Sequence, residues 1–187
     1  MNTLIGAPGA PAWLHEVATA RTRYEELLGW PVSIDVERRR LMVPVGTVLD
    51  AVTMPAALGR TVLAELRIAI LAGPVTADPA GHWWTFLIQP AAAAGTDLPA
   101  ELRRLKVRPT PRGGHAIVPI QLAHHGDGGW RWVQPPRPRQ SFATAVGGPG
   151  RHLPRGRRAG QQRALMAFLV APPSRASVVD PSRVGRA

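Results

Sequence analysis

The amino-acid sequence predicts an α+β protein, with helices packed on one mainly antiparallel sheet of five to six strands and a disordered basic tail. Segments with a helical apolar period alternate with short runs rich in β-branched and aromatic residues. A helix–strand–strand pattern occurs three times, with starts near residues 12, 55 and 98, spaced 43 apart. This spacing makes the three units candidates for one repeated supersecondary structure.

The charge is divided unevenly along the 187 residues. Residues 1–134 hold 13 Arg or Lys and 11 Asp or Glu, a balance of +2, whereas residues 135–187 hold 10 Arg and one acid, a balance of +9. These add up to the net charge of +11. We therefore expect one α+β domain over residues 12–134 and an Arg/Gly/Pro-rich, disordered tail over residues 135–187.

Nothing in the sequence indicates a membrane protein. The N-terminal residues MNTLIGAPGAPAW have neither a basic region nor a sustained apolar region of the kind found in signal peptides. No apolar run approaches the roughly 20 residues that span a bilayer. The absence of cysteine excludes disulfides and thiolate metal sites. We expect a cytoplasmic protein.

The first unit begins with a helix over Ala12–Leu28. Pro11 suits the first turn of this helix and Gly29 suits its C-terminal end. One apolar face of the helix combines Trp13, Val17, Ala20, Tyr24, Leu27 and Leu28. A hairpin follows, with strands over Val32–Val36 and Leu41–Val45.

The second unit has a helix over Pro55–Leu71 and a hairpin whose second strand covers His82–Gln89. That strand contains the largest concentration of aromatic residues in the chain, and we expect it to be a central strand. Alternation places Trp84, Phe86 and Ile88 on one face and Trp83, Thr85 and Leu87 on the other. The predicted core of this strand consists of Trp83, Trp84, Phe86 and Ile88.

The third unit has a short helix over Leu98–Lys106 and a strand pair formed by Val107–Pro111 and His115–Ile120. The turn between these strands is Arg112-Gly113-Gly114. Backbone N–H groups of such a turn could bind a phosphate, but no nucleotide-binding motif accompanies them and a hairpin turn is favoured. A last strand is predicted over Trp130–Gln134, where Trp130 and Trp132 could stack on bases or close the end of the sheet.

Asp35 and Glu37 are the leading candidates for catalysis. Two residues apart on a predicted strand, their carboxylates would share one face and could bind Mg²⁺ or Mn²⁺. The alternative is a solvent-facing edge that forms ion pairs with the basic turn over residues 38–40. Weaker metal candidates, each also explained by an ordinary loop or surface position, are the loop residues His124, His125 and Asp127, and the pair His82 and His115.

The tail is the expected site for DNA or RNA, since arginines neutralise backbone phosphates regardless of sequence. The candidate nucleic-acid-binding residues are Arg151, Arg155, Arg157, Arg158 and Arg163. The one apolar patch of the tail covers Ala164–Ala171. A frameshift near residue 140 of a GC-rich gene is an alternative origin for this segment, and translation of the other two frames would test it.

Three short segments carry a family resemblance: Leu27-Leu28-Gly29-Trp30-Pro31-Val32, the Gly- and Pro-containing hairpin over residues 73–81, and the strand over residues 130–136. They resemble the bifunctional DNA primase/polymerase N-terminal domain family of high-GC bacteria. The similarity covers residues 12–136 and suggests a short member of the family. Full members carry a D-x-D-type strand and a downstream His for metal-dependent nucleotidyl transfer. Asp35-Val36-Glu37 is the closest match here, but it comes earlier in the chain, and the His has no counterpart.

These observations lead to three hypotheses about function. The first is a non-catalytic, nucleic-acid-linked or regulatory binding module that needs no cofactor. The second is a primase/polymerase-like nucleotidyltransferase that uses Asp35, Glu37 and Mg²⁺ or Mn²⁺. The third is a protein–protein interaction module without a role in nucleic-acid binding. The sequence leaves the substrate and the oligomeric state open.

Overall fold

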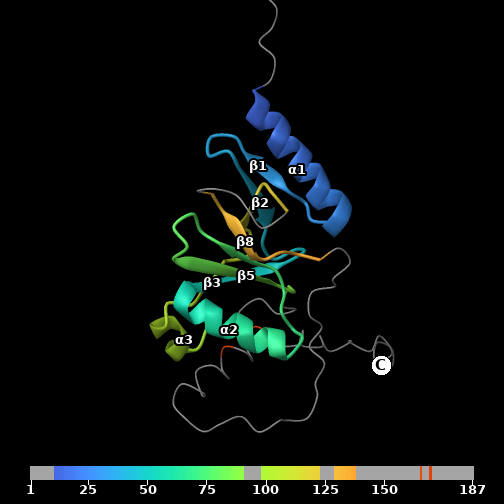
Figure 1. The fold of residues 1–187 in the computed structure, drawn as a ribbon. Helices are drawn as coiled ribbons and strands as arrows, with labels where there is room; N and C mark the ends of the chain where they lie inside the picture. The colour runs from blue at the N-terminus through green and yellow to red at the C-terminus, as the bar shows by residue number, and fades with distance from the viewer. Residues whose placement is uncertain (1–10, 91–97, 123–128, 138–164, 166–168, 170–187) are drawn as a thin grey trace, which may run out of the picture.

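The computed structural model describes residues 11–90, 98–122 and 129–137, together with Leu165 and Leu169. It has three layers (Figure 1): a helix with a three-stranded sheet, then a five-stranded sheet, then two shorter helices. Every strand pairing within the two sheets is antiparallel. The predicted α+β class is confirmed, but the strands form two sheets where the sequence predicted one.

Helix α1 (Ala12–Leu28) has the bounds that its apolar period predicts. Pro11 precedes the helix, and Gly29 ends it with a φ of 67° while its N–H donates to the Glu25 carbonyl. This left-handed conformation costs glycine little, because it has no Cβ. Val17, Ala20 and Tyr24 are the buried residues of the helix, and they turn its apolar face toward the sheets.

The three-stranded sheet has the order β1-β2-β7, with β1 over Ser33–Asp35, β2 over Arg40–Pro44 and β7 over His115–Val118. Strands β1 and β2 form the first predicted hairpin. In β2, Leu41 and Val43 are buried and their neighbours are partly exposed. This alternation is the pattern of a strand with one covered face.

The five-stranded sheet has the order β6-β3-β5-β4-β8. Its strands are β3 (Asp50–Pro55), β4 (Val75–Ala77), β5 (Trp83–Ile88), β6 (Arg108–Pro109) and β8 (Arg131–Gln134). Strand β5 lies at the centre, as its composition predicted, and β4 and β5 form the second predicted hairpin.

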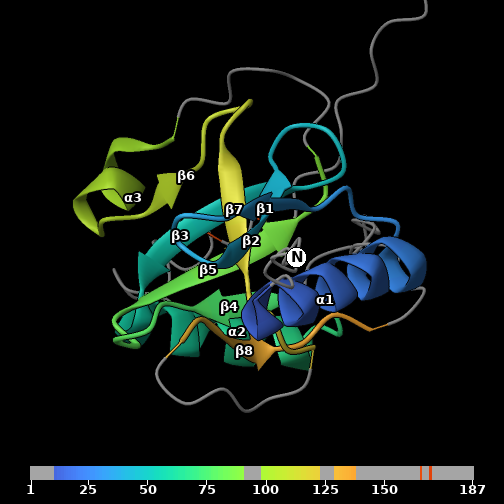
Figure 2. The ribbon, with the colours of Figure 1, turned by 90° about the horizontal axis from the view of Figure 1, so that it is seen from above.

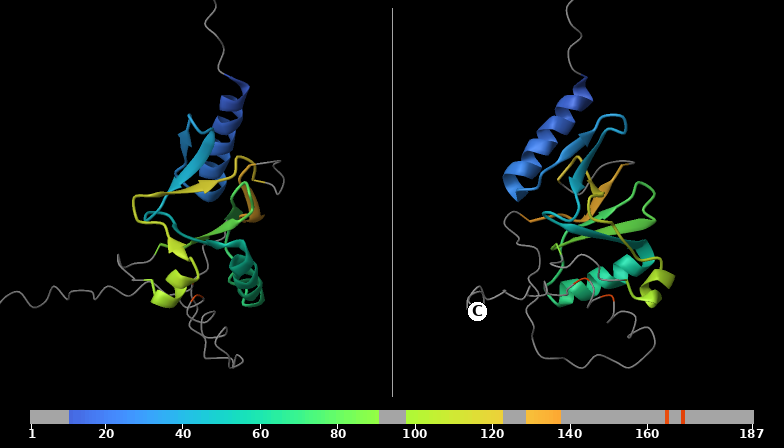
Figure 3. Two further views of the ribbon diagram at one scale, coloured as in Figure 1. Left: turned by 90° about the vertical axis from the view of Figure 1, so that its left-hand side faces the viewer. Right: turned by 180° about the vertical axis from the view of Figure 1, so that it is seen from behind.

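Helices α2 (Ala56–Ile68) and α3 (Ala100–Arg104) cover one face of the five-stranded sheet, as the side views in Figure 3 show. A hydrophobic core fills this layer, with Leu66 of α2, Leu102 of α3 and Phe86 of β5 among its buried members. Gly59 of α2 passes so close to the Trp84 ring that an added Cβ would lie 2.8 Å from it. A side chain at position 59 would therefore separate the helix from the sheet.

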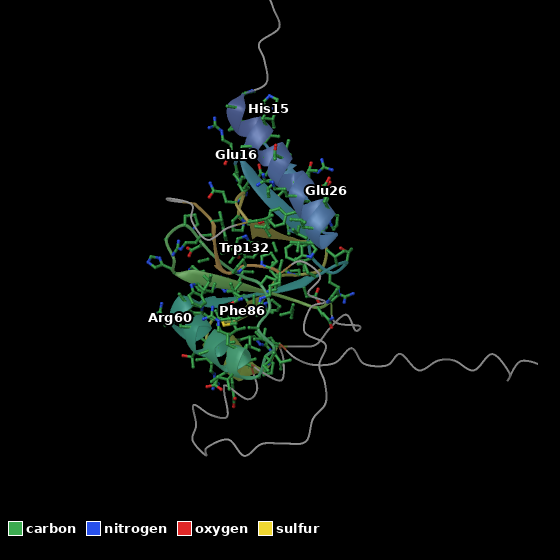
Figure 4. The ribbon with its side chains drawn as sticks, turned by 45° about the vertical axis from the view of Figure 1, so that its right-hand side comes forward. His15, Glu16, Glu26, Arg60, Phe86 and Trp132 are labelled. Carbon is green, nitrogen blue, oxygen red and sulfur yellow. The ribbon has the colours of Figure 1, made fainter. Side chains whose placement is uncertain are left out.

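A second core lies on the opposite face of the five-stranded sheet, between that sheet, the three-stranded sheet and α1. Tyr24 of α1 and Trp132 of β8 meet in this core, and Figure 4 shows Trp132 and Phe86 on opposite sides of the sheet. Trp132 Nε1 donates to the Tyr24 hydroxyl over 3.1 Å, and that hydroxyl donates to the Pro119 carbonyl over 2.7 Å. The two hydrogen bonds satisfy the buried polar atoms of both rings.

Three details of the sequence prediction are wrong. Strands β6 and β7 do not pair, because β6 joins β3 and β7 joins β2. The pattern did not identify β3, whose residues Ala51, Val52 and Met54 are buried without regular alternation. Trp83 was placed in the core, but it belongs to neither core cluster and is partly exposed.

The C-terminal segment contributes to the helix-covered core. Leu165 is helical and fully buried among the core residues of α2, α3 and the sheet, and Leu169 packs partly buried against the same cluster. The disorder predicted for residues 135–187 otherwise falls outside the described residues, except at Pro135–Arg137. The domain therefore draws a core residue from beyond the boundary at 134.

Candidate nucleic-acid interface

The acidic pair singled out by the sequence does not share a strand face. Asp35 is the last residue of β1, whereas Glu37 lies in the following turn and is 88% exposed. Asp35 Oδ1 accepts from the Arg38 backbone N–H over 3.0 Å, and Asp35 Oδ2 accepts from Arg40 Nε, also over 3.0 Å. Arg38 Nη1 lies 3.5 Å from the same Oδ2. The carboxylate closes the turn by binding arginines, and its oxygens are already engaged.

These contacts lower the pKa of Asp35, through the hydrogen bond from the Arg38 backbone N–H first and the Arg40 guanidinium after it. A lowered folded-state pKa means that the ionised carboxylate stabilises the fold above the ordinary value of 3.8. That stabilisation disappears as the pH falls through the folded-state pKa. We expect Asp35→Asn to lower the melting temperature at neutral pH and to weaken its decline in acid.

Thermal melts across the acidic range measure this effect, with Glu37→Gln as the matched control because that carboxylate is exposed. Equal acid sensitivity in the wild type and in Asp35→Asn would show that the turn does not depend on this carboxylate.

The other predicted metal and phosphate candidates are not brought together. His82 precedes β5 in one sheet and His115 begins β7 in the other, and both are exposed. The Gly113 N–H donates to Val45 O and the Gly114 N–H donates to Pro111 O, so neither points to an open phosphate site. Within the described ranges, no three His, Asp or Glu side chains are grouped so as to hold a metal ion.

Several candidates lie outside the described residues. They are His124, His125 and Asp127, and the five tail arginines Arg151, Arg155, Arg157, Arg158 and Arg163. Trp132 is described, but it is buried in the core and unavailable for stacking on bases.

The structure instead assembles a basic edge from residues 103–115, which we name the β6 edge. This segment runs from α3 through β6 into β7 and holds five cations without a carboxylate. Its cations are all exposed: Arg103, Arg104, Lys106, Arg108 and Arg112. Figure 2 shows α3 and β6 together at one border of the molecule, away from α1.

Two cations of this edge are unneutralised in the described part of the chain. Arg104 and Lys106 form no ion pair with another described residue. Arg103 differs, because its Nε donates to the Leu98 carbonyl over 3.0 Å and turns the side chain back toward its own helix. Arg104 and Lys106 are therefore exposed cations whose charge is not balanced by another described residue.

An aromatic residue adjoins the β6 edge on the five-stranded sheet. The Arg108 guanidinium lies 5.6 Å from the centroid of the Trp83 ring, a cation–π distance. Strand register explains the contact, because Arg108 is opposite Thr53 of β3, and Thr53 is opposite Thr85 of β5. Trp83 is two residues before Thr85 and so shares its face. Arg108 reaches Trp83 diagonally across β3.

Threonines lie next to Trp83 on this face of the five-stranded sheet. Thr53 Oγ1 and Thr85 Oγ1 are 2.9 Å apart and hydrogen-bonded, and Thr76 of β4 continues the same row next to Thr85. The Trp83 backbone N–H donates to Asp78 Oδ1 over 2.9 Å, which engages the carboxylate nearest to this tryptophan in sequence. The arrangement places exposed cations beside a partly exposed indole, whereas Thr76 and Thr85 are buried and do not offer their hydroxyls at the surface.

Sequence reasoning missed this surface. The sequence does contain five cations and no acid in residues 103–115. The tail has a larger positive charge, and the predicted nucleic-acid-binding residues were therefore placed in the tail. No sequence pattern placed Trp83 beside this edge, because β3 lies between β6 and β5, the strand of Trp83.

Comparison with known proteins finds no family model, no curated protein and no solved structure that matches this chain. Among the residues that the structure describes, no helix has the length and apolar character needed to cross a membrane.

Proposed function

We propose that the protein is a nucleic-acid-binding module whose folded domain contacts phosphates through the β6 edge. The observation that supports the proposal is the run of exposed cations without a carboxylate at residues 103–115, beside a partly exposed tryptophan. Cations that are not neutralised within the protein gain most from displacing the counterions of a polyanion. The tail arginines would add to the same electrostatic attraction.

The test is the salt dependence of binding to a fluorescent single-stranded oligonucleotide, measured by anisotropy with the full chain. We expect Arg104→Gln/Lys106→Gln to lower the slope of log K against log salt by about 1.4, or about 0.7 for each lost contact. The affinity at 0.1 M salt would then fall by roughly 25-fold, from the same relation.

The matched control is Arg23→Gln/Arg137→Gln, which removes the same charge from exposed positions elsewhere. This variant is expected to keep most of the affinity. Replacing the five tail arginines, 151, 155, 157, 158 and 163, by Gln measures the share carried by the tail. Substitution is preferable to truncation at residue 134, because truncation would also remove Leu165 from the core.

Equal losses in the two double variants would contradict a specific role for the β6 edge. Its cations and Pro109 would then protect an edge strand from pairing with other chains, which is a common use of such residues. If no variant of the chain binds nucleic acid, protein interaction becomes the hypothesis to test. Ile68 and Ile70, 78% and 91% exposed at the end of α2, would be the surface to examine.

A further inference from the structure

Trp83 is a large apolar side chain that the folded domain does not use in its cores. Its neighbours Trp84 and Phe86 both contact the helix-covered core, and Leu87 lies in the other core. Trp83 belongs to neither cluster and stays partly exposed on the sheet face that carries Thr53 and Thr85. A partly exposed indole on a sheet offers a surface on which a flat group can stack.

Arg108 shows what kind of group the Trp83 ring accepts. Its planar, cationic guanidinium lies over the ring at 5.6 Å from the centroid and comes from an exposed residue on an edge strand. The side chain is long and forms no ion pair with another described residue, so it can turn toward a phosphate. A base could then take its place on the indole, or the guanidinium could cover the base from the other side.

A second tryptophan, Trp13, also has an arginine over its ring and can be compared with Trp83. The Arg39 guanidinium lies 5.0 Å from the centroid of the Trp13 ring on α1. Trp13, however, packs against a hydrophobic core, and its surroundings in sequence include Glu16, while Arg39 follows Glu37. Asp78 accepts from the Trp83 backbone N–H, but the adjoining β6 edge supplies Arg104 and Lys106, which form no ion pair with another described residue. This local excess of cations favours a polyanion at Trp83.

We infer that Trp83 stacks on an unpaired base of single-stranded nucleic acid, with Arg108 and the β6 edge contacting the adjacent phosphates. The inference rests on the proposed function and narrows it to single strands. In a duplex, both faces of each base are covered by its neighbours, whereas every unpaired base offers an open ring face. Stacking is tolerant of base identity, so the inference implies little sequence preference.

The test compares the full-length wild type, Trp83→Ala and Trp83→Phe on four probes: oligothymidylate, oligouridylate, a strand of the same length without bases, and a duplex. Trp83→Ala is expected to weaken binding to the base-containing single strands by about 5- to 150-fold, the range measured for single stacked bases. Binding to the abasic strand and the duplex should change by less than about twofold, since neither presents a base that can stack. Trp83→Phe keeps an aromatic face and should retain much of the affinity.

Trp13→Ala is the matched control and should leave all four affinities near the wild-type values. Equal effects of Trp83→Ala on the base-containing and abasic strands would overturn the inference, as would no effect on any probe. Neither result would affect the test of the β6 edge with Arg104→Gln/Lys106→Gln. The proposed stacking on Trp83 and the proposed binding by the β6 edge can therefore fail separately. A preference for oligouridylate or oligothymidylate would identify RNA or DNA as the source of the single strand.

Discussion

Trp132→Ala is expected to lower the free energy of unfolding by about 3–5 kcal/mol, the range for truncating a buried aromatic residue. The Trp132 side chain is only 3% exposed and stands where β8 faces α1. Its ring lies 6.4 Å from that of Tyr24, whose ring in turn stacks on Trp30 at 6.1 Å. Removing the indole leaves a cavity between α1 and the sheet, and it takes away a donor to the buried Tyr24 hydroxyl.

Urea unfolding followed by circular dichroism measures this loss. Trp83→Ala is the matched control, because the same substitution at a half-exposed position outside both cores should cost about 1 kcal/mol or less. A loss of about 1 kcal/mol or less in Trp132→Ala, as in the control, would mean that Trp132 is not a core residue. Burial also raises the pKa of Tyr24, so its hydroxyl keeps the proton that it donates to Pro119.

Leu165→Ala is expected to cost about 2–5 kcal/mol, although the residue lies 31 positions beyond the last residue of β8. Leu165 is fully buried with Leu66 and Leu102, so its removal leaves a cavity beneath the five-stranded sheet. Leu169 is four residues further along the chain and only partly buried against the same core, so Leu169→Ala should cost less.

The same urea titration tests this prediction with the full chain. A stability of Leu165→Ala close to that of the wild type would show that the C-terminal segment is not part of the core. The expected loss, in contrast, would show that residues near 165 are needed for the fold. A tail produced by a frameshift has no physical reason to supply such a residue.

Local sequence patterns predicted an element correctly where the residues that define it lie within the element or directly beside it. The apolar period of α1, with Pro11 before it and Gly29 after it, located both ends of the helix. Alternation assigned the two faces of β5 correctly, with Phe86 toward the helices and Leu87 toward the other sheet. These features depend on residues within a few positions of each other, so the sequence contains them directly.

The same local patterns failed where the partner decides the structure. The turn Arg112-Gly113-Gly114 looks like a hairpin turn, yet the strands on either side pair with β3 and β2 in different sheets. Strand β3 has buried residues on both faces, so it lacks the alternation by which a half-buried strand is recognised. The prediction that Asp35 and Glu37 share a strand face is wrong, because β1 ends at Asp35 and the chain turns there.

Local sequence patterns predicted the α+β class, helix α1, the first two hairpins and the central position of β5. Only the tertiary structure divided the strands into two sheets, buried Leu165 and left Trp83 outside both cores beside Arg108. The physical reason is that alternation specifies which face a side chain joins, whereas pairing and layer packing decide which part of that face is covered. Trp83 and Trp132 therefore share a sheet face but differ in burial, and only Trp83 is partly exposed.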